Sequence, residues 1–388
     1  MSDRDDPVRA GSAGRPGGIA GVLRNWSDRY DRFQRRWFAT PAVVSGLLVV
    51  LGILPFVLDI RVFGVGLGTF LSVHILTIAL VWAITAQSWN VISGFAGQFS
   101  FGHAAFFGLG AYVPLMLVRE FGVNPWIGML VGGIVASLYG LFIGALTFRF
   151  SVRGSYFTLA TLAFAELLLY LFINVEALGS ASGFVKPLPR SYGADFGLVA
   201  FQFRETLPYY YVALAFLAVV SVVAIVIKQS RIGLYLRAIR DDEAAARAVG
   251  IPTVRYKLLA FGVSAFFTAW AGTFWTMYFS SIRPEVVFGL LVNIDILLPA
   301  VIGGVGTVAG PIVGSVVLTG ASEVARQSFD LPGIQDIVYG LILLAIVLRG
   351  SGAVESLVRR PIERLRKIID RRGSPDEPAR AGTGPGDD

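Results

Sequence analysis

Long apolar runs separated by short polar stretches dominate the chain between about residues 42 and 350. About 20 consecutive apolar residues are enough to cross a bilayer as a helix. This criterion predicts ten membrane-spanning helices, of which the eighth and tenth are short and could be kinked or re-entrant. They lie near 42–58, 67–88, 101–118, 126–148, 156–174, 209–227, 258–279, 288–303, 310–326 and 335–348. The predicted fold class is an all-α polytopic membrane protein.

Composition agrees with a membrane protein and narrows the possible chemistry. The 388 residues are 55% hydrophobic and 15% charged, whereas soluble domains carry about 25% charged residues. The chain has no cysteine, which excludes disulfides, a thiolate nucleophile and cysteine metal sites. It has only two histidines, and no nucleophile–base pair is visible. We therefore expect neither an enzyme nor a resident metal or cofactor.

The basic residues predict the orientation in the membrane, because lysine and arginine concentrate on the cytoplasmic side. With both termini cytoplasmic and ten alternating spans, 26 of the 33 Lys and Arg residues lie inside. We therefore divide the chain into a basic cytoplasmic segment (1–41), a transmembrane domain (42–350) and a cytoplasmic tail (351–388). Both terminal segments are predicted to be partly disordered. The basic residues flank spans without interleaved aromatic residues, so no nucleic-acid partner is expected.

Glycine and alanine recur every fourth position in two of the predicted spans. Gly, Gly, Ala, Gly and Gly occupy positions 128, 132, 136, 140 and 144, and glycines occupy 306, 310 and 314. Small residues at this spacing share one helix face and allow close helix packing in lipid. The glycine-rich "GGVGTVAGP" lacks the lysine of a phosphate loop and the third glycine of the dinucleotide pattern. If ATP is used, another chain must bind it.

One cytoplasmic loop, residues 228–257, combines charges with alanines in "RAIRDDEAAARAVGIPTVRYK". Asp241, Asp242 and Glu243 suit a helix N-terminus, and the alanines that follow favour a helix. Gly250 suits the position just after a helix, and Thr253 can cap the next one. The sequence predicts a two-turn helix with a small, alanine-rich face that inserts into a groove of a partner. A solvated linker turn is the alternative.

Three well-separated blocks resemble a known family. The pattern Glu243-x-Ala245-Ala246-x3-Gly250 resembles the EAA coupling loop of ABC importer permeases. Residues 88–112 ("SWNVISGFAGQFSFGHAAFFGLGAY"), 237–272 and 293–318 resemble the LivM-type permeases of branched-chain amino acid importers. The segment 178–183 departs from the pattern of that family.

The resemblance implies an ATP-driven importer in the inner membrane of a bacterium, in which this chain has no ATPase site of its own. A binding protein would deliver an amino acid, a second homologous permease would pair with this chain in the lipid, and two ATPase subunits would dock below. Glu243, Ala245, Ala246 and Gly250 would couple the ATPases to transport. A urea or short-amide permease is the alternative within this class. An ion-coupled carrier is a third possibility, but no internal repeat supports it.

A few polar residues inside spans are candidates for the translocation path, because ionisable groups in lipid are costly. Irregular backbone at membrane depth is tolerated only beside protein or a cavity, which favours the glycine-broken segment 90–103. The candidates are Asn90, Gln98, Ser100, His103, Glu166 and Asp295. For Glu166 and Asp295 a structural role and a path role are both open. His103 suits capping and local hydrogen bonding, with a gate role as the alternative.

Overall fold

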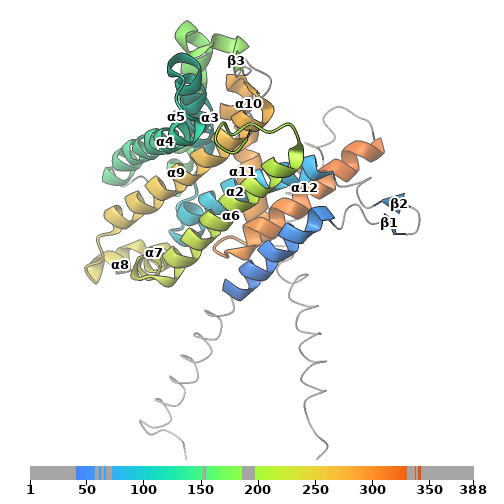
Figure 1. Ribbon diagram of the computed structural model, residues 1–388. Coiled ribbons are helices and arrows are strands. Elements are labelled where there is room, and N and C mark those ends of the chain that lie inside the picture. The colour runs from blue at the N-terminus through green and yellow to red at the C-terminus, as the bar shows by residue number, and fades with distance from the viewer. Residues whose placement is uncertain are drawn as a thin grey trace, which may run out of the picture.

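The computed structural model describes residues 41–56, 72–150, 154–185 and 197–329, with isolated positions at 61–62, 65–66, 152, 337 and 340–341. In these ranges the backbone is almost wholly helical (Figure 1). After a first helix, Pro41–Phe56, come α2 (Val73–Asn90), its π-helical continuation η2 (Val91–Phe95), α3 (His103–Phe121), α4 (Pro125–Arg149), α5 (Ser155–Asn174), α6 (Thr206–Gln229), α7 (Arg231–Asp241), α8 (Glu243–Ala248), α9 (Thr253–Phe279), α10 (Pro284–Phe288), α11 (Leu290–Gly303) and α12 (Ala309–Phe329).

Short elements decorate the connections between these helices. Two 3₁₀ turns, η3 (Glu176–Leu178) and η4 (Ser180–Ser182), follow α5. Two-residue strands form two antiparallel pairs. These are β1 (Arg61–Val62) with β2 (Val65–Gly66), and β3 (Phe184–Val185) with β4 (Ser281–Ile282). The second pair ties the segment after α5 to the end of α9.

Seven helical segments within the described residues are long and apolar enough to cross a membrane. They are α2–η2, α3, α4, α5, α6, α9 and α10–α11, which confirms a multi-pass membrane protein. The predicted eighth span is α10–α11, which bends at the extended Gly289 and is therefore kinked. The predicted first and ninth spans are the helices Pro41–Phe56 and Ala309–Phe329, neither of which is among the seven. The predicted tenth span, 335–348, lies almost wholly outside the described residues.

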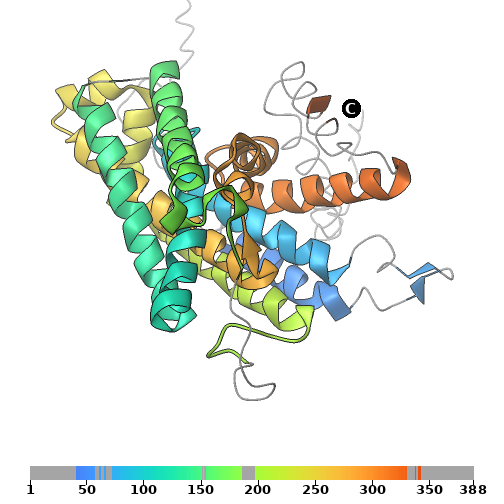
Figure 2. The same cartoon turned by 90° about the horizontal axis from the view of Figure 1, so that it is seen from above.

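Helix α2 forms the centre of the bundle. Of its most apolar stretch, 94% is buried, because α6, α9, α11 and α12 all pack against it. Figure 2 shows α4 and α5 along one side of the molecule and α12 on the opposite side. Helix α5 is the most peripheral of the seven, with only 28% of its corresponding stretch buried.

The polar connections gather at two opposite ends of the bundle. At one, which we call the α8 end, Phe148 at the end of α4 stacks on Phe157 of α5 and lies 4.5 Å from Lys257 Nζ of α9. At the other, which we call the β3 end, Trp126 at the start of α4 donates a 2.7 Å hydrogen bond to the Leu198 carbonyl. Figure 1 shows α7 and α8 far from β3.

The predicted close packing of the α4 glycines is confirmed. A Cβ at Gly140 would lie 3.0 Å from Ala265 Cβ of α9, and one at Gly132 would lie 3.1 Å from the Pro114 ring of α3. In the second row, Gly314 packs α12 on α11, where a Cβ would lie 2.0 Å from the Pro299 carbonyl oxygen. The assignment of Gly306 to this helical row was wrong, because it has φ +82° in the turn before α12.

Replacing Gly140 with leucine is expected to lower the temperature at which the detergent-solubilised protein aggregates. The larger side chain must push α4 away from α9, and overpacking of this kind costs about 1–3 kcal/mol. Gly132→Leu should act in the same direction against α3. The matched control is Gly46→Leu, because no atom lies within 4 Å of a Cβ there. Equal aggregation temperatures for Gly140→Leu and Gly46→Leu would contradict tight packing at this site.

Candidate functional site

The short helix predicted in the loop 228–257 is present as α8. Asp242 caps its N-terminus, because the carboxylate accepts hydrogen bonds from the N–H groups of Ala244 at 2.8 Å and Ala245 at 3.0 Å. The helix before it, α7, was not predicted; its inner face buries Gly233, Leu236 and Ile239. Their three-residue spacing was the available signal. The loop is therefore two helices that meet at a capped corner.

The C-terminal end of α8 also follows the prediction. Gly250 adopts φ +86°, in the left-handed region that favours glycine. The Ile251 N–H donates to the Ala246 carbonyl at 3.1 Å, as in a Schellman motif. The predicted capping role of Thr253 was wrong, because Pro252 occupies the N-cap position, no side chain caps α9, and Thr253 is the first residue of the helix. Its hydroxyl instead lies 3.4 Å from a carboxylate oxygen of Glu243.

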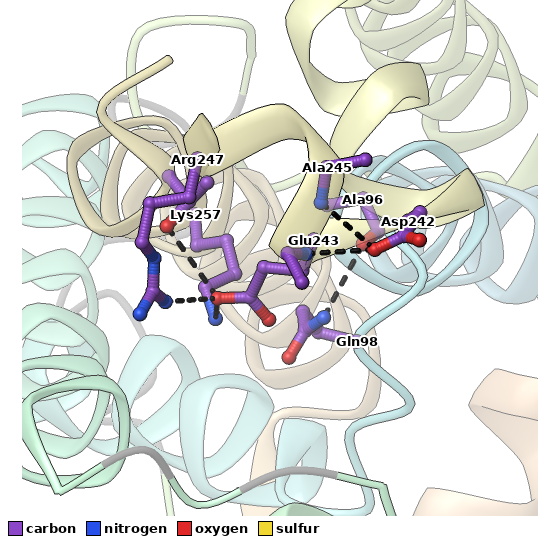
Figure 3. Close-up of polar contacts among 9 residues, drawn as sticks. Ala96, Gln98, Asp242, Glu243, Ala245, Arg247 and Lys257 are labelled. Atoms are coloured by element: carbon purple, nitrogen blue, oxygen red, sulfur yellow. Dashed lines mark hydrogen bonds and ion pairs between the residues drawn. The ribbon is translucent and has the colours of Figure 1, made fainter. Parts of the chain in front are cut away.

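The Glu243 carboxylate faces the bundle and forms ion pairs with two basic side chains (Figure 3). Its Oε1 lies 2.9 Å from Lys257 Nζ and 3.1 Å from an Arg247 guanidinium nitrogen. The Lys257 side chain is only 2% exposed and the Glu243 side chain 12%, whereas Arg247 is 52% exposed. Lys257 Nζ also lies over the Phe148 ring. Glu243 therefore fastens α8 to α9 and, through Lys257, to the end of α4.

The outer face of α8 is small and apolar. Ala244, Ala245, Ala248 and Val249 are exposed, and Val249 is 77% exposed. Ala246 is 4% exposed and faces the bundle, so it can position α8 but cannot itself touch a partner. A face without long side chains allows another protein surface to approach the helix backbone closely.

Asn90, a path candidate, is fully buried and binds a turn that is distant in sequence. Its side-chain amide donates to the Thr307 carbonyl at 2.6 Å, and its Oδ1 accepts from the Gly306 N–H at 2.7 Å. Both groups belong to the turn between α11 and α12. Gly94 is required beside this clamp, since a Cβ there would lie 1.9 Å from Asn90 Oδ1.

Ser100 and His103, also path candidates, are buried in a hydrogen-bond chain. Ser264 Oγ donates to the Ser88 carbonyl at 2.6 Å, so it accepts from His103 Nε2 at 2.7 Å. His103 Nδ1 lies 3.1 Å from Ser100 Oγ, which is free to donate to it. The expected local hydrogen bonding of His103 is confirmed, and the arrangement suits a neutral ring protonated on Nε2. The expected capping role was wrong, because Gly102 is the N-cap of α3 and no side chain caps that helix.

The other three path candidates lie apart from one another. Gln98 is half-buried in the break between η2 and α3, with its side-chain nitrogen 3.4 Å from the Ala96 carbonyl oxygen. Figure 3 shows it near the corner formed by α7 and α8. Glu166 is half-buried on peripheral α5, and Asp295 is half-buried on α11. The structure thus brings Asn90, Gln98, Ser100 and His103 into one region, whereas Glu166 lies on the peripheral helix α5.

The helical bundle, with its glycine-packed spans and capped helix at one end, defines a multi-pass membrane protein. The chain belongs to the family described as "Branched-chain amino acid transport system / permease component", whose sequence profile matches residues 71–347. The match covers every helix from α2 to α12, together with the loop 228–257.

Individual relatives agree with this family. The chain is 27% identical over 299 residues to the high-affinity branched-chain amino acid transport system permease protein LivM of Salmonella typhimurium, covering 72% of this chain and 69% of LivM. It is 25% identical over 289 residues to LivH of the same organism, covering 71% and 92%. It is also 26% identical over 309 residues to the L-arabinose transport system permease protein AraH of Escherichia coli, covering 78% and 89%. No solved structure matches the chain significantly.

Proposed function

We propose that this chain is a permease subunit of an ATP-driven ABC importer for branched-chain or related amino acids. The observation that carries the proposal is the capped helix α8, which lies within the region of the family match. A second homologous permease would form the translocation path with it, and two ATPase subunits would dock at the α8 end. A binding protein would deliver cargo at the β3 end.

The proposed location is the inner membrane of a bacterium, with ten spans and both termini in the cytoplasm. The α8 end faces the cytoplasm, because loop 228–257 carries seven Lys and Arg residues. The helix Pro41–Phe56 supports an inside N-terminus, since its Leu51 carbonyl accepts a hydrogen bond from Tyr210 near the start of α6. That contact supports an orientation with residue 51 toward the β3 end and residue 41 toward the cytoplasm.

The cysteine-free chain makes this orientation simple to test. Cysteines placed singly at the exposed positions Arg231 and Arg247 should react with an impermeant maleimide in inside-out vesicles and not in right-side-out cells. Labelling of intact cells at either position would reverse the proposed topology.

The residue roles follow from these contacts. Ala245 would meet the ATPase, while Glu243, Ala246 and Gly250 hold α8 in position for it. Asn90, Gln98, Ser100 and His103 would shape the path from the break between η2 and α3. Glu166 on the exposed side of the bundle, and Asp295, would reach the path at the surface shared with the second permease.

The cargo is tested by uptake into proteoliposomes that contain the complete complex and its binding protein. Uptake of leucine, isoleucine or valine that requires ATP and survives a protonophore would support the proposal. The similarity to AraH favours a pentose as the second candidate, so arabinose belongs in the same panel, with urea for the short-amide alternative. Uptake abolished by the protonophore in the presence of ATP would instead indicate an ion-coupled carrier.

Replacing Gly250 with valine is expected to reduce uptake without removing the chain from the membrane. Nothing lies within 4 Å of a Cβ at this position, so the cost is backbone strain of about 1–2 kcal/mol at φ +86°. That strain misplaces α8 rather than unfolding the spans. Asparagine tolerates this conformation better, so Gly250→Asn is the matched control. Uptake and ATPase stimulation equal to wild type in Gly250→Val would make this stretch only a linker.

A further inference from the structure

Two basic side chains from the cytoplasmic loop reach into the irregular backbone of the bundle. Arg240, in the last turn of α7, donates from NH1 to the Gly94 carbonyl at 3.0 Å. Its stem lies against Gly97, where a Cβ would be 2.6 Å from Arg240 Cγ. Gly97 has φ +69° and begins the non-helical break between η2 and α3. Arg240 therefore contacts the end of η2 and the start of that break from outside.

The second basic side chain, Lys228, contacts the turn between α11 and α12. Lys228 Nζ, at the end of α6, donates to the Gly306 carbonyl at 3.0 Å. A Cβ at Gly306 would lie 2.9 Å from Arg240 NH1 and 3.2 Å from the Gly94 carbonyl oxygen. The glycine-rich "GGVGTVAGP" stretch is thus the meeting point of α2, α6, α7 and α12. Its sequence matches neither nucleotide-binding pattern.

We call the site where Arg240 and Lys228 meet Gly94 and Gly306 the junction. It connects directly to α8 and to the buried hydrogen-bond chain of Ser93, Ser100 and His103. Arg240 is two residues before the Asp242 cap of α8. On the other side, Ser93 Oγ donates to the Gln98 carbonyl and accepts from the Ser100 N–H, and Ser100 reaches His103. Since irregular backbone must find its hydrogen bonds outside its own helix, a shift of α7 necessarily changes the partners of the break.

We propose that Arg240 and Lys228 are positioning residues that transmit movement of α8 to the end of η2 with the break that follows it, and to the turn at 304–307. The inference rests on the proposed function, because it needs an ATPase that moves α8. Arg240 touches neither cargo nor nucleotide in this scheme. Its guanidinium suits the task because it presents several donors in a fixed geometry.

The first test compares Arg240→Met with Arg231→Met in the reconstituted complex. Both substitutions remove one charge from an exposed position of α7, but Arg231 lies at the start of the helix, whereas Arg240 donates to the Gly94 carbonyl. For Arg240→Met we expect uptake and the stimulation of ATPase by loaded binding protein to fall about tenfold, the usual size of an allosteric coupling, with the ATPases still bound. Arg231→Met should match wild type. Arg240→Lys should be intermediate, and it carries the test if Arg240→Met does not reach the membrane.

A second measurement is independent of the cargo. A single cysteine at Phe99, which is 41% exposed in the break, reports on this segment through its rate of reaction with maleimide. Trapping the ATPases with ATP and vanadate should change this rate severalfold in Phe99→Cys and leave it unchanged in Phe99→Cys/Arg240→Met. This comparison separates the two ideas: a failure of all uptake in wild type removes the proposed cargo, while the labelling still tests transmission.

Three results would overturn the inference. One is wild-type stimulation and uptake in both Arg240 variants. Another is an equal loss in Arg240→Met and Arg231→Met, which would mark a general effect of charge. The third is dissociation of the ATPases from the Arg240→Met complex, because Arg240 would then act in docking rather than in transmission.

Discussion

Replacing Lys257 with methionine should release α8 from the bundle and abolish productive docking of the ATPases. Lys257 Nζ lies 2.9 Å from the Glu243 carboxylate, and its side chain is 2% exposed. Removing one partner of a buried ion pair costs about 3–5 kcal/mol when the remaining charge is left unpaired, and the loss here should lie toward the lower end because Arg247 still pairs with Glu243. Glu243→Gln should have the same consequence from the opposite side. The measurements are retention of the ATPases during purification and the melting temperature of the complex.

Arg247 provides the matched control, because it binds the same carboxylate oxygen from an exposed position. Its nitrogen lies 3.1 Å from Glu243 Oε1, but its side chain is 52% exposed. Exposed ion pairs contribute about 0–1 kcal/mol, so Arg247→Met should stay close to wild type. The double variant Glu243→Gln/Lys257→Met should recover much of the loss, since neither charge is then left alone. Equal losses for Lys257→Met and Arg247→Met would show that Glu243 does not anchor α8 through the buried pair.

The limits of α8 could be predicted from the sequence, whereas the contacts of Glu243 with Lys257 could not. The limits of α8 were readable because Asp242 and Gly250 act on amides and carbonyls within a few residues of themselves. The direction of the Glu243 side chain was not readable, because it depends on how α9 folds back against α8 after the intervening turn. A lysine at the start of a span was indistinguishable from an ordinary flanking charge until the packing was known.

The same distinction between local and distant contacts applies to the bundle. The apolar runs predicted the spans, and four-residue spacing predicted the face of α4 that packs closely, since both are properties of a single helix. The hydrogen bond between the Asn90 side chain and the Gly306 N–H joins residues 216 positions apart. Nothing in the local pattern of either segment specifies the other. The irregular backbone expected within residues 90–103 is present, but its hydrogen-bond partners include residues of α5, α7 and α9 and of the turn between α11 and α12, which the local sequence does not specify.

Replacing Asn90 with leucine should destabilise the bundle and stop transport together. The substitution conserves approximate volume but removes the partners of two backbone groups, the Gly306 N–H and the Thr307 carbonyl. Each buried group left unsatisfied costs about 1–3 kcal/mol. The turn before α12 would then seek other partners and shift relative to α2. Thermal aggregation of the solubilised protein and uptake by the reconstituted complex measure the two effects.

A clamp and a cargo-contacting role for Asn90 predict different companions for this variant. If Asn90 is a clamp, Gly94→Ala should reproduce Asn90→Leu, because the new Cβ would lie 1.9 Å from Asn90 Oδ1 and 2.6 Å from the Gly306 nitrogen. Gly46→Ala, which meets no neighbouring atom within 4 Å, should be neutral apart from helix propensity. If Asn90 instead binds cargo, Asn90→Leu should keep a wild-type aggregation temperature and alter only the concentration dependence or selectivity of uptake. That second pattern would assign Asn90 to the surface of the path and remove it from the junction that holds α12.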